Sequence, residues 1–148
     1  MAHVVSSDTQ FFADQVEQLD LAVDQLGLKD RNFDRFAILL IDNVVELTLH
    51  RHAEAQQRRQ EQRLWYRRPK PGDDERARAA TAALGQRFDA KVKLAKMTGM
   101  LSFELGDSIL YLHSFRNTAH HSGLRHEGIL HALAIFYVKS ACLSLCVR

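Results

Sequence analysis

The chain has 148 residues, which is the length of one ordinary domain, and 46% of them are apolar, enough to bury a useful core. It contains two Pro and seven Gly, a content that favours long uninterrupted elements, and its two Cys are too few for a disulfide scaffold. Cys142 and Cys146 are four residues apart, a spacing that suits a bridge poorly. We therefore expect a single domain over residues 1–148, in the reducing environment of the cytoplasm.

We expect neither export nor a membrane span. The first ten residues, MAHVVSSDTQ, lack the basic region and the apolar run of a secretory signal. The apolar stretch from Ile129 to Val147 is long enough for a span, but His131 and Lys139 interrupt it, which favours a buried helix. Because the chain stops at Arg148 directly after this stretch, we expect its end to pack against a partner or to continue in a longer protein.

Apolar residues at three- and four-residue steps predict two helices in the first half of the chain. The first runs over about residues 8–26, and Gly27 follows it as a C-terminal cap. The second opens near Asp30 and reaches about Arg63, although its apolar stripe fades past His50. The expected core-facing residues are Phe12, Val16, Leu19, Val23 and Leu26 in the first helix, and Phe33, Phe36, Ala37, Leu40, Val44 and Leu47 in the second.

Three further helices are expected after a loop at residues 67–75, where Pro69, Pro71 and Gly72 disfavour a helix. No segment alternates like a strand, so we predict an all-α bundle of four or five helices. The third helix covers about residues 74–97 and ends at Thr98-Gly99, the fourth runs from near Ser102 to His120 or His121, and the fifth runs from His126 to the end.

Charge is unevenly spread along the chain. The segment from Arg51 to Lys70, which we call the basic arm, carries seven Lys or Arg against two Glu, whereas the first 34 residues carry seven Asp or Glu. Basic residues in the arm interleave with Trp65 and Tyr66, and this pattern suits RNA because cations track phosphates while aromatic rings stack on bases. A solvated helix end is the alternative. The residues expected to contact RNA are Arg58, Arg59 and Arg63.

A dense polar cluster lies near the end of the fourth expected helix. Five of the eight His fall between positions 113 and 131, interleaved with Arg116, Asn117 and Arg125. On a continuous helix each residue turns by roughly 100°, so Arg116 and His120 share a face while His121 lies about 140° away. A helix break before Gly123 would let His121 approach Arg116, and spacing alone does not choose between the two His.

The segment RNTAHH, residues 116–121, resembles the hallmark of the HEPN family (higher eukaryotes and prokaryotes nucleotide-binding), in which an Arg and a polar residue are followed by three positions and a His. That pattern selects His121 over His120. The run FDRFAILLIDNVVELTLHRH resembles the family's long, partly polar second helix. The order of KVKLAKMTG, the motif helix and a final apolar helix is also similar. The resemblance covers the chain from about Asp30 onward.

The resemblance implies a HEPN-like helical bundle that cleaves RNA without a metal or another cofactor, with Arg116, Asn117 and His121 as catalytic residues. Arg stays charged and offers a planar fork to phosphate oxygens, while His titrates near neutrality and can transfer protons. Asn117 is expected to fix His121 or the phosphate. One His does not easily act as acid and base at once, so we expect a homodimer that joins two motifs. Further RNA contacts are expected from His120, Arg125 and His126, with solvated positions at the rim as the alternative for the two His.

The resemblance also suggests partners. Family members are commonly toxins paired with an antitoxin, or parts of anti-phage systems, so RNA, a second copy and an antitoxin such as a small nucleotidyltransferase are expected. One toxin branch carries a Tyr two places after the motif His, which its antitoxin modifies; Gly123 stands there in this chain, so that regulation is not expected. Other members have lost activity and bind a nucleotide, RNA or a protein, and a purely structural helical subunit is a further alternative.

Simpler roles are open for several of these residues. Arg116 can cap a helix C-terminus, or pair with Glu104 or Asp107, instead of serving a reaction. His113 and His131, on apolar helices, are more typical of core or interface His that have a hydrogen-bond partner.

A metal site is not expected. A zinc site from His120, His121 and His126 would lack the Cys or carboxylate that completes such a set.

Overall fold

The structure, a computed structural model, describes residues 6–66, 71–122 and 129–146, although the side chains of residues 64, 66 and 119–122 fall outside that description. The described residues form six α-helices and no strand, which confirms the all-α class. The count exceeds the four or five helices expected, because the segment predicted as one third helix contains a turn.

The first two helices are α1 (Ser7–Gly27) and α2 (Arg31–Tyr66). Ser6 caps α1 by accepting a hydrogen bond from the backbone N–H of Thr9. Gly27 was expected to end α1 as a cap, but it is the last helical residue, and Lys29 instead takes the left-handed backbone with φ of 51°. The chain reverses there because Asp30 then caps α2, accepting a hydrogen bond from the N–H of Asn32 at 2.8 Å.

The predicted third helix is wrong as a single element. The chain forms α3 (Asp73–Ala83) and α4 (Phe88–Met97), separated by a turn at Gly85. The buried Lys91 of α4 holds this turn by donating a hydrogen bond from Nζ to the carbonyl oxygen of Gly85 at 2.7 Å. The sequence hides the break, because good helix formers surround its single Gly.

The last two helices are α5 (Phe103–Ser122) and α6 (Leu130–Cys146). The predicted end at Thr98-Gly99 is confirmed, since Gly99 takes a φ of 75°, and Ser102 caps α5 through a hydrogen bond from the N–H of Leu105. The expected start of the last helix at residue 126 lies outside the described residues. Cys142 and Cys146 are free, exposed thiols on α6.

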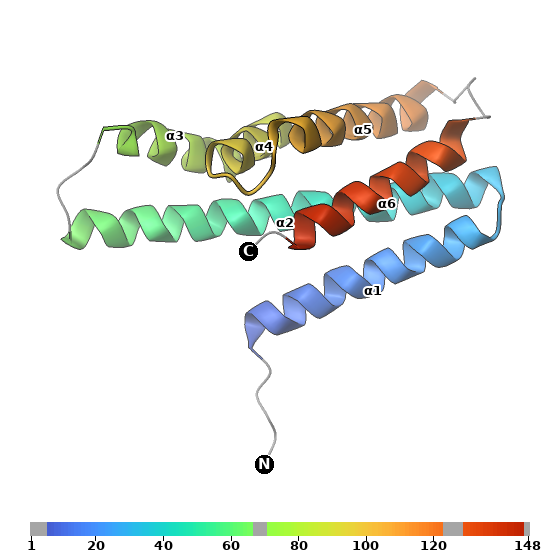
Figure 1. Cartoon of the computed structure of the whole chain (residues 1–148), viewed down its shortest axis with the longest axis horizontal. Coiled ribbons are helices and arrows are strands. Elements are labelled where there is room, and N and C mark those ends of the chain that lie inside the picture. The colour runs from blue at the N-terminus through green and yellow to red at the C-terminus, as the bar shows by residue number, and fades with distance from the viewer. Residues whose placement is uncertain (1–5, 67–70, 123–128, 147–148) are drawn as a thin grey trace, which may run out of the picture.

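The long helix α2 is the centre of the molecule and packs against each of the other helices. In Figure 1, α1 lies along one side of α2, while α3, α4 and α5 follow one another along another side, and α6 lies between α1 and α5. Helix α5 therefore runs antiparallel to α2, and α6 runs in the same direction as α2. The core between them includes Ile41, Val45, Ile109 and Ala134, all almost fully buried.

The core face of α1 agrees with the predicted stripe at Leu19 and Leu26 and differs at its other positions. Gln15, Leu19, Ala22 and Leu26 are buried, whereas Phe12, Val16 and Val23 are at least one-third exposed. In α2, the predicted core residues Ala37 and Val44 are buried, whereas Phe33, Phe36 and Leu47 are exposed. The rest of the buried stripe is Ile38, Ile41, Val45 and Leu49. The buried stripe faces the other helices, each of which packs against α2.

The α6 helix is the apolar segment that raised the question of a membrane span. Within the described residues, no helix combines the length and the apolar character that crossing a bilayer requires.

Candidate functional site

The candidate site is organised around one buried carboxylate. Asp42 lies on α2 among Ile41, Val44 and Val45, and its side chain has no exposed surface. Burying a carboxylate is costly unless charged and hydrogen-bonding groups surround it. Two helices supply such groups here, α5 with His113 and Arg116 and α6 with a tyrosine.

A closed ring of polar contacts joins the side chains of Asp42, His113, Asn117 and Arg116. His113 Nδ1 lies 2.9 Å from Asp42 Oδ1, and Asn117 Nδ2 lies 3.3 Å from His113 Nε2. Arg116 donates from Nη1 to Asn117 Oδ1 at 2.7 Å, and its Nε lies 3.2 Å from Asp42 Oδ2. The Nε–H is not aimed at that oxygen, so this last contact is an ion pair without a hydrogen bond. The ring holds the Arg116 side chain in one place.

The tautomer of a neutral His113 follows from its neighbours. Arg116 can only donate, so the oxygen of Asn117 faces it and the amide nitrogen of Asn117 donates to His113 Nε2. The proton of a neutral His113 then lies on Nδ1 and points to Asp42. The ring of Phe88 stacks on the imidazole with a centroid distance of 3.7 Å and an interplanar angle of 5°, which fixes its plane.

Tyr137 of α6 completes the surroundings of the carboxylate. Its hydroxyl donates to Asp42 Oδ1 at 2.5 Å, and the side chain is almost fully buried. Burial and, after it, the charge of Asp42 raise the pKa of Tyr137 far above its usual value. The hydroxyl therefore stays protonated and serves as a permanent donor to Asp42.

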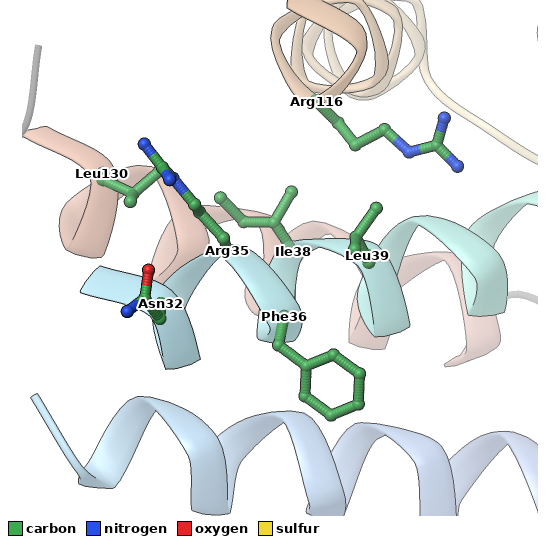
Figure 2. A pocket seen from close by; sticks show the side chains of 7 residues that line it. All are labelled: Asn32, Arg35, Phe36, Ile38, Leu39, Arg116 and Leu130. Carbon is green, nitrogen blue, oxygen red and sulfur yellow. The ribbon is translucent and has the colours of Figure 1, made fainter. Parts of the chain in front are cut away.

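A pocket of about 280 Å³ lies beside this ring, between α2, α5 and the start of α6. Figure 2 shows Arg116 descending from α5 over Leu39, with its guanidinium group at one side of the pocket. The Arg116 side chain is 30% exposed, so part of it remains accessible to a ligand. The pocket is lined by Asn32, Arg35, Phe36, Ile38, Leu39, Arg116 and Leu130.

The structure brings together two of the three residues predicted to be catalytic, Arg116 and Asn117. Within the described side chains, the amide group of Asn117 is hydrogen-bonded to Arg116 and His113. The side chain of His121 lies outside the described residues, as does that of His120. The backbone of α5 is helical through Ser122, so the helix break that was considered before Gly123 does not occur up to that residue.

Two more predicted RNA contacts, Arg125 and His126, also lie outside the described residues, and so does the zinc site considered for His120, His121 and His126. Among the residues that the structure describes, no cluster of three or more His, Cys, Asp or Glu could hold a metal ion.

Two of the simpler roles considered for the His residues are confirmed. His113 pairs with Asp42, and His131 of α6 pairs through Nδ1 with Asp34 of α2 at 2.9 Å. Arg116, in contrast, pairs with neither Glu104 nor Asp107 but with Asp42, because its side chain crosses to α2. Asp107 pairs with Lys96.

The basic arm gathers part of its charge in a second pocket. Arg59 and Arg63 of α2 and Arg76 of α3 line a polar pocket of about 200 Å³, together with Gln56, Gln60 and Thr98. Arg63 Nη1 lies 3.7 Å from Asp73 Oδ1. No described carboxylate forms an ion pair with Arg59 or Arg76. Arg58 is exposed but does not line this pocket.

The sequence interpretation missed Asp42, Tyr137 and Arg35. A signal for Asp42 was present, since a lone carboxylate in the apolar run AILLIDNVV must find donors when that run is buried. Tyr137 and Arg35 carry no comparable signal, because a tyrosine in an apolar helix and an arginine in the first turns of a helix are both ordinary.

No protein-family model, curated protein or solved structure matches the chain.

Proposed function

We propose that the chain is a metal-independent endoribonuclease of the HEPN type, which cleaves RNA at a site built on Arg116, Asn117 and His121. The observation that supports this most is the ring that holds Arg116 between Asn117 and Asp42, at the wall of a pocket. A guanidinium group that is fixed before the substrate arrives is suited to stabilise the charge that develops on a phosphate.

The proposed reaction uses the RNA's own 2′-hydroxyl as the nucleophile. The 2′-oxygen attacks the adjacent phosphorus while a base removes its proton, and the bond to the 5′-oxygen of the next nucleotide breaks as an acid protonates that oxygen. The products are a 2′,3′-cyclic phosphate and a 5′-hydroxyl. Arg116 stabilises the additional negative charge on the phosphate oxygens, and no oxidant or cofactor is needed to balance the step.

Proton transfer is assigned to His121, because His is half-protonated near neutral pH. A single His does not serve as base and acid in one step, so the proposal includes a two-fold dimer in which two copies of the motif face one RNA strand. His113 is a poor candidate for the second proton-transfer group, since both of its ring nitrogens are occupied by Asp42 and Asn117.

The deciding experiment is cleavage of single-stranded RNA by the whole chain in the presence of a metal chelator. We expect fragments that carry 2′,3′-cyclic phosphates, while DNA of the same sequence stays intact because it lacks the 2′-hydroxyl. Arg116→Ala should lower the rate by about 10²–10³-fold, by analogy with the loss of an oxyanion-hole donor. Activity that the chelator abolishes, or equal cleavage of DNA, would contradict the proposed chemistry.

The rival function is binding of RNA, a nucleotide or a protein without cleavage. The observation that favours it is the pairing of Arg116 with Asp42, which offsets part of the charge that catalysis would use. Tight RNA binding by a folded dimer, with no cleavage of any RNA tested, would establish this rival.

A toxin or anti-phage role, with an antitoxin as partner, is the biological setting that we propose for the nuclease.

A further inference from the structure

The pocket beside Arg116 has a second arginine that the function proposed above does not use. Arg35 lies on α2 two turns before Asp42 and lines the pocket together with Arg116. Its Nε is buried and has no hydrogen-bond partner within the described part of the chain. No described carboxylate pairs with its guanidinium group, although Asp34 precedes it, because Asp34 is turned to His131.

A buried donor without a hydrogen-bond partner is costly, so this position favours the binding of a polar group such as a water or an anion. A guanidinium group is best satisfied by the oxygens of a phosphate or a carboxylate, which match its fork of donors. Arg35 is therefore a ready binding group for an anion that enters this pocket.

The two arginines do not converge on one point. Figure 2 shows the guanidinium group of Arg35 extending toward Leu130, while that of Arg116 extends in the opposite direction, over Leu39. Between the two lie apolar side chains, among them Ile38 and Leu39. A ligand that satisfies both arginines needs two anionic groups separated by a body that is partly apolar.

We propose that this pocket binds one nucleotide of the RNA strand, with the phosphate on one side of the nucleotide at Arg116 and the phosphate on the other side at Arg35. The ribose and base then lie over Ile38 and Leu39, and the exposed amide of Asn32 is placed to contact polar atoms at the rim. This proposal deepens and rests on the proposed nuclease function, since it names Arg35 as the residue that holds the phosphate next to the one that reacts.

The size and charge of the pocket favour a strand over a lone ion. Its volume of about 280 Å³ is just below the range of roughly 300–1,000 Å³ typical of small-molecule sites, which suits one nucleotide better than two. A single inorganic phosphate would reach only one of the two guanidinium groups. A nucleoside 3′,5′-bisphosphate reproduces both phosphates of one nucleotide and is the smallest probe that can reach both.

The test measures binding separately from cleavage. An RNA oligonucleotide with 2′-O-methyl riboses cannot be cleaved through its 2′-oxygen, and its dissociation constant is measured by fluorescence anisotropy over a series of salt concentrations. The variant is Arg35→Gln, and the matched control is Arg87→Gln, which removes the same charge from an exposed position at the turn before α4. Adenosine 3′,5′-bisphosphate and adenosine 5′-monophosphate then serve as competitors of the oligonucleotide.

We expect Arg35→Gln to weaken oligonucleotide binding by about fivefold at 0.1 M salt, because one phosphate contact to a single strand contributes a salt slope of about 0.7. The slope of log Kd against log salt concentration should fall by about 0.7, and Arg87→Gln should bind the oligonucleotide as the unmodified chain does. The bisphosphate should compete better than the monophosphate, and this advantage should vanish in Arg35→Gln. Melting curves check that the variants are folded.

The outcomes separate this inference from the proposed function. Cleavage of RNA by the unmodified chain, with Arg35→Gln binding the oligonucleotide as tightly as Arg87→Gln, would overturn the role of Arg35 and leave the nuclease in place. Binding of the bisphosphate that depends on Arg35, in a chain that cleaves no RNA, would support the pocket and overturn the nuclease. Equal competition by the bisphosphate and the monophosphate would overturn the two-phosphate arrangement.

Discussion

Arg116 Nε lies 3.2 Å from Oδ2 of Asp42, so a motif residue near the end of α5 is tied to a buried carboxylate of α2. The same carboxylate receives hydrogen bonds from α5 and α6 through His113 and Tyr137. Three helices therefore meet at one charge. Any change at Asp42 should act on the stability of the fold and on the position of Arg116 together.

The first prediction measures both effects, on stability and on RNA cleavage, in one variant. Asp42→Asn leaves the ring without its negative charge and places an amide donor or oxygen opposite Arg116, so we expect a loss of about 3–5 kcal/mol in the free energy of unfolding. Since a small misplacement of a positioning group costs about 10²-fold in rate, RNA cleavage should fall by a similar factor. Urea titration and single-turnover cleavage measure the two quantities.

Tyr137→Phe is the control for that experiment. It removes one buried hydrogen bond to Asp42 but leaves the contact between Asp42 and Arg116 in place. We expect a loss of about 1–2 kcal/mol in stability with cleavage near the unmodified rate. Equal loss of activity in the two variants would mean that Asp42 acts through general stability rather than through Arg116.

The second prediction concerns assembly through the outer surface of the last two helices. Exposed apolar side chains occur on α5 at Phe103 and Tyr111 and on α6 at Phe136 and Leu143. Phe136→Lys should convert the expected dimer into a monomer, because it places a charge in the apolar contact. Phe12→Lys on α1 is the matched control, since Phe12 and Phe136 are 50% and 48% exposed. Light scattering that reports a monomer for the unmodified chain at micromolar concentration would count against a site shared by two copies.

The third prediction concerns the basic arm. Replacing Arg58, Arg59 and Arg63 together by Ala should reduce the salt slope of RNA binding by about 2, which is about 0.7 for each lost phosphate contact. Among single variants, Arg59→Ala should weaken binding more than Arg58→Ala, because Arg59 lines the pocket that also contains Arg63 and Arg76. A slope that stays unchanged in the triple variant would show that the arm is only solvated surface.

The fourth prediction is a pH dependence at His52. Burial and, after it, the charge of Arg59 lower the pKa of His52 below its usual 6.5, so the ring stays neutral in the fold and its Nε2 bonds to Thr98 Oγ1. The unfolded chain takes up a proton that the folded chain does not. The contribution of His52 is therefore fully present above pH 6.5 and is lost as the pH falls below that value.

The measurement compares melting temperatures of the unmodified chain and of His52→Gln between neutral and mildly acidic pH. Gln retains a donor for Thr98 but does not titrate, so the variant should lose less stability on acidification. Phosphate or an RNA oligonucleotide bound in the pocket that Arg59 lines with Arg63 and Arg76 should offset the charge of Arg59 and raise the pKa of His52. Nuclear magnetic resonance can follow this change. Identical pH profiles for the two proteins would exclude this role for His52.

The helical fold was predictable because apolar spacing and end signals act locally. Ser102 and Gly99 mark helix ends in the sequence and do so in the structure. The turn at Gly85 was not predictable, because it depends on the buried Lys91 of the following helix, a tertiary contact without a local signal. The inward face of α1 was misassigned in part for a related reason, since packing against the other helices buries Ala22 and leaves its neighbour Val23 exposed.

The candidate site was predictable in part. Arg116 and Asn117 were singled out because the segment RNTAHH, residues 116–121, resembles the HEPN hallmark. Their partners were not predictable from spacing, since Asp42 lies 74 residues before Arg116 and meets it only when α5 packs antiparallel to α2. Pairing between distant helices is a property of the assembled fold, so pattern analysis finds one side of such a contact at best.

The last prediction tests which His performs proton transfer. If the motif register is right, His121→Ala removes that step and lowers the cleavage rate by about 10²–10⁴-fold. His120→Ala should cost far less, although plain helix geometry places position 120 on the same face as Arg116. The two variants carry the same substitution at neighbouring positions near the end of α5, so each is the control for the other. A His120→Ala variant as inactive as His121→Ala would refute the register, and a His120→Ala variant that alone is inactive would move the role to His120. Loss of proton transfer should also flatten the pH dependence of the rate near neutrality in the affected variant, which a mere loss of folding would not do.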